Sequence, residues 1–360
     1  MHHRHALLIA SVLAVAAACG GDDTTSSTSG NAVTATTSLS TIEPATSTTD
    51  VAASTTEAVA STTQVVTSTT EVVPSTTEAA TSTTDVAVAD TPSVDLGAAA
   101  WSTVYGFGGV WIQVDPPVDQ VVKVDENSGE ITLRIDRGRG AAMADDAVWV
   151  VDGIETRKID PMTGEVLLVV QTPDASYVSV GAGSVWVPAS GGVSRIDPST
   201  GDLIVTIPTE HGVTDLAATD DAVWVTHKTA GYVTRIDPAT NTVVAQIETG
   251  AGAHDLAIGH DSIWITNYQS NTVSRIDPTT NTVIATIKGV GSGVGIDAGG
   301  DSVYVSTRHS GISRIDPTTN VATPIAEFPE WNYGIAYGNG ELWVSSVDQS
   351  CVYRLALATG

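Results

Sequence analysis

The feature that most constrains the fold is a repeat with a period near 40 residues, which begins at about residue 98. An aromatic residue inside a β-branched run returns seven times, at Trp111, Trp149, Trp186, Trp224, Trp264, Tyr304 and Trp343. A second marker, an apolar residue followed by Asp and in five cases by Pro, occurs after each of the first six aromatics. A degenerate copy, Leu355-Ala356, follows the seventh. Both markers therefore count seven units.

Each unit divides into four short strands separated by turn residues. In the unit at 253–288 the strand candidates are 254–258, 262–267, 272–276 and 282–287. The Asp-Pro element forms a hairpin loop, because Pro presets φ and Asp accepts local backbone N–H groups. We interpret these Asp residues as structural, with metal ligation as the weaker alternative, since a single metal site needs its ligands only once. A repeat of this period predicts an all-β fold, a seven-bladed β-propeller of four-stranded blades.

The two ends of the repeat region predict how the ring closes. The sequence stops at Gly360, just after the third strand of the seventh unit, so that blade lacks its outermost strand. The segment Pro-Ser-Val-Asp-Leu-Gly at 92–97 stands where a fourth strand is expected. We predict that this N-terminal strand completes the last blade and leaves no long open edge.

A basic residue stands two positions before the loop Asp position in all seven units. These residues are Lys123, Lys158, Arg195, Arg235, Arg275, Arg314 and Arg354. A ring of bases can bind an anion, but strand faces between packed blades are partly buried. We therefore expect these side chains to pair with neighbouring acids.

The sequence of residues 1–90 predicts an export signal followed by a flexible spacer. Residues 1–19 have a basic start, an apolar run from Ala6 to Ala18 and then Cys19, which is typical of a lipoprotein signal peptide. We expect lipidation at Cys19 and attachment to the extracytoplasmic face of the cell membrane through that anchor alone; a plain cleavable signal is the alternative. Residues 20–90 are rich in Ser and Thr, repeat Ser-Thr-Thr every seven residues between 47 and 85, and have too little to bury, which predicts a disordered stalk. The propeller is expected at 91–360, with Cys351 as a small buried hydrophobe.

The net charge of the globular part limits the classes of partner that we expect it to bind. From residue 98 onward there are 31 acids and 14 bases, a formal balance of 14 − 31 = −17. Such a surface repels phosphate backbones and anionic headgroups, so we expect no nucleic acid partner and no direct membrane binding by the domain. Small molecules, glycans, proteins and cations remain as candidates, and we expect a monomer.

The unit containing Trp264-Ile265-Thr266-Asn267 and Arg275-Ile276-Asp277-Pro278 resembles the repeat of the YVTN-type β-propellers. The resemblance covers about residues 98–360. A related seven-bladed group, the streptogramin (virginiamycin B) lyases, is similar in repeat architecture. That similarity implies, as an alternative, a metal-assisted elimination that uses His and acidic groups. No residue of that chemistry aligns securely onto this chain, so the catalytic residues are not assigned.

The site prediction rests on loops that share one face of a propeller around its central channel. Positions about ten before each marker aromatic, and three or four after it, differ from blade to blade. They supply the candidate ligand-binding residues Trp101, Arg139, Tyr177, Asp215, His227, His254, Asp255, Tyr268, Arg308, His309, Trp331 and Tyr333, with Asn267, Thr307 and Asn332 beside them. Non-repeated polar and aromatic residues are what an asymmetric ligand requires, although a solvated mouth also varies freely.

Three histidines among these candidates keep a divalent cation among the candidate ligands. His227, His254 and His309, with Asp215 or Asp255, have the chemistry to bind a divalent metal or to act as acid and base. No P-loop, nucleophile elbow or dinucleotide glycine fingerprint occurs in the sequence. We therefore predict a non-catalytic binding module on the cell envelope that uses the channel face for a small molecule, glycan or protein. A metal-dependent lyase or hydrolase is the alternative.

Overall fold

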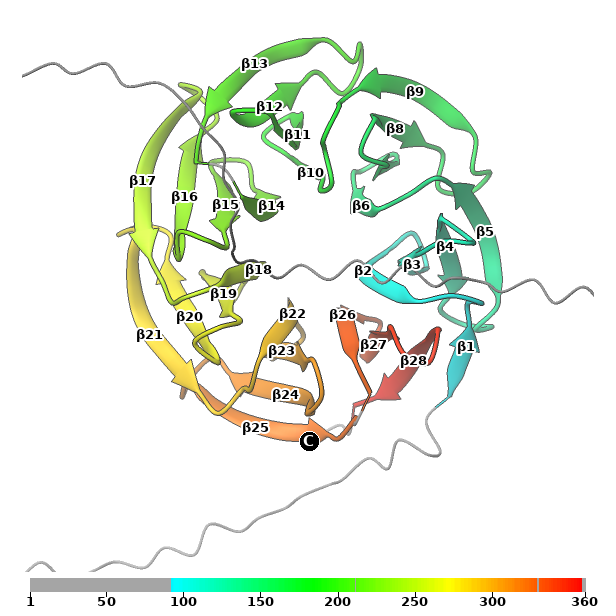
Figure 1. The fold of residues 1–360 in the computed structure, drawn as a ribbon, viewed down its shortest axis with the longest axis vertical. Helices are drawn as coiled ribbons and strands as arrows, with labels where there is room; N and C mark the ends of the chain where they lie inside the picture. Colours follow the sequence, from blue (N-terminus) through cyan, green and yellow to red (C-terminus); the bar gives the residue numbers. More distant parts are fainter. Residues whose placement is uncertain (1–91, 211, 329, 358–360) are drawn as a thin grey trace, which may run out of the picture. The chain divides into compact units, whose positions relative to one another are not determined.

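The protein's computed structural model describes residues 92–210, 212–328 and 330–357, which form seven four-stranded antiparallel sheets arranged in a ring (Figure 1). This confirms the all-β, seven-bladed propeller of four-stranded blades. The predicted signal peptide, Cys19 and the stalk lie outside the described residues. Within the described residues, no helix is long and apolar enough to span a membrane.

The blades follow one another along the chain, each running from the inner strand to the outer one. Blade 1 contains β2 (Ala100–Gly106), β3 (Gly109–Val114), β4 (Gln120–Asp125) and β5 (Ile131–Asp136). Blade 2 contains β6 (Gly140–Met143), β7 (Val148–Val151), β8 (Glu155–Ile159) and β9 (Val166–Gln171). Blade 3 contains β10 (Ser179–Gly181), β11 (Ser184–Ala189), β12 (Gly192–Ile196) and β13 (Leu203–Pro208). Blade 4 contains β14 (Val213–Ala218), β15 (Val223–His227), β16 (Tyr232–Asp237) and β17 (Thr242–Glu248).

The remaining three blades keep the same order. Blade 5 contains β18 (Ala253–Gly259), β19 (Ser262–Asn267), β20 (Thr272–Asp277) and β21 (Thr282–Lys288). Blade 6 contains β22 (Gly293–Gly299), β23 (Ser302–Thr307), β24 (Gly311–Asp316) and β25 (Val321–Ala326). Blade 7 contains β26 (Asn332–Gly338), β27 (Glu341–Ser346), β28 (Cys351–Ala356) and β1 (Ser93–Asp95).

The last blade is completed from the other end of the chain, as predicted. Strand β1 pairs antiparallel with β28, with Val94 opposite Val352. The next residue of the segment, Leu96, is 2% exposed and packs in the core that joins blades 7 and 1. The N-terminal strand therefore contributes both backbone pairing and buried apolar surface to the closure of the ring (Figure 1).

The marker aromatics are the largest side chains of the blade cores. All seven are buried, and the six tryptophans among them are at most 1% exposed. In five blades the basic residue of the third strand lies over its own blade's tryptophan, as Arg275 does at 4.8 Å from the Trp264 ring centroid. Its guanidinium also reaches the next blade, where Nη1 donates to Oδ1 of Asn320 at 3.0 Å. Repeated aromatic and basic positions thus fasten neighbouring blades together.

The predicted pairing of this basic ring with acids is only partly correct. Lys158, Arg235, Arg314 and Arg354 do form ion pairs, with Asp146, Asp221, Asp301 and Glu341 respectively. Arg195 and Arg275 instead cap the next blade's Asp-Pro loop through the Pro carbonyl and the Asn amide oxygen. The reason is spatial, because the loop of the following blade lies within reach of the third strand.

The Asp-Pro loops are turns, as predicted. In blade 5, Oδ1 of Asp277 accepts the backbone N–H of Thr279 at 2.7 Å and that of Thr280 at 3.3 Å. Asn281 then takes φ of 56°, a left-handed conformation that Asn tolerates well. These Asp residues are occupied by local backbone donors, which supports their structural role.

Two sets of loops define the two faces of the ring. In an up-and-down blade, the loop between the second and third strands lies at the same end as the segment entering the inner strand. Backbone hydrogen bonds join them, from Tyr268 N to Gly252 O at 2.9 Å and from Val347 N to Trp331 O at 2.8 Å. We call this end the channel face; the Asp-Pro loops lie at the opposite end.

Candidate functional site

The inner strands of all seven blades surround a central cavity of about 480 Å³. Its lining includes small and apolar residues and several polar side chains, among them five from blades 3, 4, 5 and 7: Tyr177, Asp215, His254, Asp255 and Tyr333. All five were predicted as site residues from their position nine or ten residues before a marker aromatic.

The channel aspartates connect one blade to the next. Oδ2 of Asp215 accepts the backbone N–H of Leu256 at 3.1 Å, and Oδ2 of Asp255 accepts that of Ile296 at 2.9 Å. Asp297, which sequence reasoning did not select, accepts the N–H of Tyr337 at 2.7 Å in the same way. Each carboxyl group thus bridges to the following inner strand, where no ladder of backbone pairing is available.

The electrostatics of this layer favour protonated acids. Burial raises the pKa of Asp215, and burial together with the neighbouring Asp215 raises the pKa of Asp255 well above its ordinary range. Burial also raises the pKa of Tyr177 and Tyr333, with further contributions from both aspartates. Burial lowers the pKa of His254, so the neutral imidazole is favoured. All of these shifts favour the uncharged form of the group concerned.

A group of contacting side chains surrounds the opening of the channel, and we call it the mouth cluster. It consists of Trp101, Lys228, His254, Tyr268, Arg308, Trp331 and Tyr333. The Trp101 ring lies 5.2 Å from Trp331 and 5.0 Å from Tyr333, both edge to face. The hydroxyl of Tyr333 lies 3.3 Å from Nε2 of His254, within hydrogen-bond distance. These residues come from blades 1, 4, 5, 6 and 7, so their meeting depends on the ring being closed.

The two cations of the mouth cluster share one tyrosine. Nη1 of Arg308 donates to the Tyr268 hydroxyl at 3.0 Å, and its guanidinium lies 4.0 Å from the Trp331 ring centroid. Nζ of Lys228 lies 5.8 Å from the Tyr268 ring centroid. Among the described ranges, neither cation has a carboxylate within 4.0 Å.

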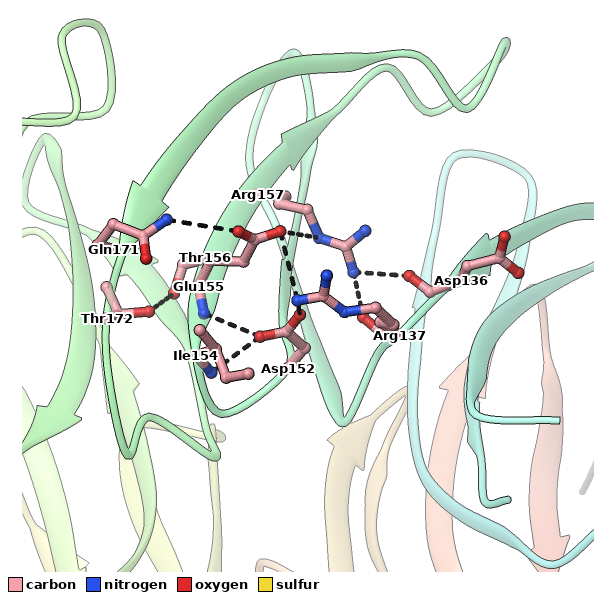
Figure 2. Close-up of polar contacts among 9 residues, drawn as sticks. All are labelled: Asp136, Arg137, Asp152, Ile154, Glu155, Thr156, Arg157, Gln171 and Thr172. Atoms are coloured by element: carbon pink, nitrogen blue, oxygen red, sulfur yellow. Dashed lines mark hydrogen bonds and ion pairs between the residues drawn. The ribbon is translucent and has the colours of Figure 1, made fainter. Parts of the chain in front are cut away.

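The cations of blade 2 show the opposite arrangement (Figure 2). There Arg137 pairs with Asp152 at 2.5 Å and approaches Glu155 at 3.7 Å, while Arg157 lies 3.8 Å from Glu155. Arg157 also donates to the backbone oxygen of Asp136 at 2.8 Å. This network satisfies its own charges and ties the end of blade 1 to blade 2, so we interpret it as structural.

The predicted residues separate into those at the opening and those elsewhere. Trp101, His254, Tyr268, Arg308, Trp331 and Tyr333 join the mouth cluster, and Tyr177, Asp215 and Asp255 line the channel. His309 is exposed and borders a small adjoining cavity. Arg139 is exposed beside Gly153 in blade 2, with no described contact to the cluster.

His227 lies inside its blade and not at the opening. It is fully buried, its Nε2 is 3.0 Å from Thr234 Oγ1, and its ring packs 5.0 Å from Tyr232. Asn267 and Thr307, at the equivalent positions, also bond within their own blades. The third residue after the marker aromatic therefore points into the blade, and we leave His227 out of the proposed site.

The fourth residue after the marker is the one that reaches the opening. This position supplies Tyr268 and Arg308, and also two residues that the sequence reasoning missed. Lys228 is the fourth residue after Trp224, and Asp115 is the fourth after Trp111, where its Oδ2 accepts Trp101 Nε1 at 2.6 Å. Lys228 and Asp115 could have been found in the sequence by treating the third and the fourth residue after each marker aromatic as separate positions.

The histidines do not assemble a metal site. Within the described ranges, no group of three or more His, Cys, Asp and Glu side chains is placed to hold a metal ion. His227 is buried in blade 4, His254 lines the channel and His309 faces outward in blade 6. The possible divalent metal thus has no ligand set among these residues.

Sequence comparison matches one part of the chain to a protein family. The model of a domain of unknown function, DUF5074, matches residues 169–290. No curated protein shows significant sequence similarity to the chain.

Several solved structures share this architecture. Virginiamycin B lyase from Staphylococcus aureus, in a catalytically inactive form with quinupristin, has 16% identity over 74% of this chain and 98% of its own, with a TM-score of 0.63. U3-55K has 9% identity over 75% and 99%, with a TM-score of 0.67. The RRP9 WD40 repeats have 9% identity over 75% and 98%, with a TM-score of 0.66. The domain therefore has the propeller fold of these proteins.

Proposed function

We propose that the channel face binds a small molecule or glycan that presents a flat ring or sugar face, and that the domain is a binding module and not a catalyst. The observation that carries this proposal is the mouth cluster. Its four large aromatic rings, those of Trp101, Tyr268, Trp331 and Tyr333, come from three blades and are partly accessible around one opening. Partly exposed aromatic rings beside a few fixed polar groups are the usual composition of a ligand site.

The arrangement below the rings supports the same function. The channel layer places His254 and the two aspartates beneath the aromatic rings, within a cavity of about 480 Å³. A cavity of this size accepts a drug-sized molecule or a short glycan. Because the polar side chains are held by backbone contacts from neighbouring blades, the site is ordered before a ligand arrives and binding costs less conformational entropy.

The sequence adds a location to this proposal. A lipid on Cys19 and a stalk at 20–90 would display the propeller on the extracytoplasmic side of the membrane. Metabolic labelling with a fatty acid tests the anchor. We expect label in the wild type and none in Cys19→Ala, which should be released into the medium; labelling of Cys19→Ala would contradict lipidation at this residue.

The alternative function is a metal-assisted lyase, and the shared fold with virginiamycin B lyase is the observation in its favour. The separation of the three candidate histidines argues against it. Incubation of the full chain with quinupristin, with and without EDTA and with mass spectrometry as readout, separates the two. Ring opening that EDTA abolishes would establish the lyase, and intact substrate would favour the binding module.

The binding proposal is tested with a ligand screen on the full chain by thermal shift, followed by calorimetry of each hit. A ligand of the channel face should raise the unfolding midpoint, because it binds only the folded state. Trp331→Ala and Tyr268→Ala should weaken its binding by about tenfold or more, the effect of losing a central aromatic contact.

The matched control is Phe107→Ala, which removes a half-buried aromatic ring from the β2–β3 turn on the opposite face. This variant should bind like the wild type once its fold is verified. Full affinity in both mouth variants, or an equal loss in the control, would contradict a site at the mouth cluster.

A further inference from the structure

A second, smaller cavity adjoins the mouth cluster on the side of blades 5 and 6. It has a volume of about 260 Å³ and is lined by Tyr268, Ser292, Thr307, Arg308, His309 and Ser310. None of these residues is acidic, although acids outnumber bases by 31 to 14 from residue 98 onward. The lining supplies the guanidinium of Arg308, the imidazole of His309 and the hydroxyl groups of Tyr268 and Ser310 as hydrogen-bond donors for an anion. The hydroxyl groups of Ser292 and Thr307 already donate to Asn271 and to the backbone oxygen of Gly311.

The guanidinium of Arg308 has donor capacity that the protein itself leaves unused. Nη1 is occupied by the Tyr268 hydroxyl, while the buried Nε, like that of Arg157 and of Arg235, finds no hydrogen-bond acceptor among the described residues. Arg308 differs from those two arginines because no carboxylate of the described ranges lies within 4.0 Å of it, whereas Arg157 lies 3.8 Å from Glu155 and Arg235 lies 3.8 Å from Asp221. An arginine without a carboxylate partner is costly to desolvate, and most other bases of this domain avoid that cost. Arg137 and Arg157 have acids beside them (Figure 2). Arg195 and Arg275 have backbone and amide acceptors.

Lys228 adds a second cation beside the same tyrosine. Its side chain is exposed, lies over the Tyr268 ring and has no ion-pair partner within 4.0 Å in the described ranges. Two unpaired cations that contact one aromatic side chain concentrate positive charge at a single place on an acidic domain. That arrangement attracts an anionic group through Coulomb interaction and positions it beside the aromatic rings.

The channel beneath does not cancel this attraction. Burial raises the pKa of both Asp215 and Asp255, and the charge of Asp215 raises the pKa of Asp255 further. A protonated member of the pair lowers the negative charge under the opening. An anion at Arg308 thus meets less repulsion than the number of nearby acids suggests.

We propose that the channel ligand is an acidic sugar, whose ring lies on the aromatic residues of the mouth cluster and whose carboxylate or sulfate occupies the cavity beside Arg308 and Lys228. This inference rests on the proposed binding function and names its ligand class. A sugar fits better than an aromatic acid, because Ser292, Thr307 and Ser310 line the cavity with hydroxyl oxygens that can accept hydrogen bonds from the hydroxyl groups of a glycan.

The experiment measures affinity by calorimetry on the full chain with matched acidic and neutral probes. One arm compares a galacturonate trimer with its methyl ester, and a second compares a sulfated disaccharide with its desulfated form. We expect an acidic probe to bind about tenfold or more tightly than its neutral partner, as loss of a charge-assisted hydrogen bond implies, and we expect that preference to weaken with salt. The arm with the larger preference identifies the anionic group.

Three charge-neutralising variants locate the effect. Arg308→Gln should abolish the preference for the acidic probe, and Lys228→Gln should reduce it without affecting the fold, because Lys228 is exposed. The matched control is Arg134→Gln, which makes the same charge change on the outermost strand of blade 1 and should retain the full preference. An unchanged thermal midpoint in each variant excludes general unfolding as the cause.

The possible results separate this inference from the function on which it rests. Equal affinity for acidic and neutral probes, or a preference that survives in Arg308→Gln, overturns the acidic ligand while leaving a ring-binding site intact. Absence of binding by every probe at millimolar concentration overturns the acidic-sugar inference, and the Trp331→Ala and Tyr268→Ala variants then decide the binding function with other ligands. A preference lost in Arg308→Gln and kept in Arg134→Gln supports both.

Discussion

The pKa of aspartate is shifted in opposite directions in the Asp-Pro loops and in the central channel of this ring. In the Asp-Pro loops, Asp277 is partly exposed and accepts two backbone N–H groups, which lower its pKa. In the channel, Asp255 accepts a backbone N–H from the next blade, but burial and Asp215 raise its pKa well above the ordinary range. The comparison shows that the Asp repeated in the Asp-Pro loops is stabilised as an ion by its own loop, whereas the channel Asp, which occurs only in blades 4 and 5, is held at a cost.

The tryptophans divide in the same way. Trp264 occurs at the repeated marker position and is completely buried within blade 5. Trp331 has no counterpart in the other units; it remains partly exposed, with Arg308 stacked on its ring. Repeated positions therefore account for stability, and the non-repeated positions of the channel face are available for binding.

The largest expected effect comes from removing part of the repeated framework altogether. A chain that begins at residue 98 lacks β1 and the buried Leu96, so blade 7 has an open edge and blades 7 and 1 lose shared core. We expect it to lose the single cooperative unfolding transition. A chain that begins at residue 92 is the control and should melt like the full chain in calorimetry. Identical melting of the two truncations would show that closure does not need β1.

The second prediction contrasts the two classes of tryptophan directly. Trp264→Ala should cost about 3–5 kcal/mol of unfolding free energy, because it leaves a cavity in a closed core. Trp331→Ala should cost only about 1 kcal/mol, the scale of its aromatic contacts, while it weakens ligand binding. Urea denaturation measures both. A cost for Trp331→Ala as large as that for Trp264→Ala would contradict the division between framework and site.

The sequence predicted the framework well because the repeat samples each structural position seven times. Seven buried aromatics, the turn role of Asp277 and the strand at 93–95 all follow from comparing units with one another. The contacts of Arg275 with the next blade were not predictable in this way, because a period does not show which neighbouring loop lies within reach of a side chain.

The candidate site was predicted only in part, because its residues lack counterparts to compare. Position relative to the marker selected Tyr268 and Arg308 correctly as residues at the opening, but it also selected His227 and omitted Lys228. Adjacent residues of a strand point to opposite faces, so an uncertainty of one residue exchanges a buried side chain for an exposed one. Mutual contact among residues from five blades is a property of the closed ring and cannot be read from spacing.

The smallest expected effect, and the most direct test of the two classes of aspartate, is the pH dependence of stability. A carboxyl group with a raised folded-state pKa binds more protons when folded, so its contribution to stability falls as pH rises from about 3.9 through that raised pKa. A group with a lowered pKa contributes stability above about 3.9 that is lost as pH falls through the folded value. Asp255 belongs to the first class and Asp277 to the second.

Urea denaturation of the wild type, Asp255→Asn and Asp277→Asn between pH 3 and pH 8 separates these contributions. Relative to the wild type, Asp255→Asn should gain stability as pH rises above about 4, since it has no buried carboxylate to ionise. Asp277→Asn should lose less stability than the wild type on acidification below that value. His254 titrates beside Asp255 with a lowered pKa and the opposite slope, so the difference between variants is the quantity to compare. If the curve for Asp255→Asn runs parallel to that of the wild type above pH 4, the channel pair is ionised in the folded protein, and the reduced charge inferred beneath Arg308 is wrong.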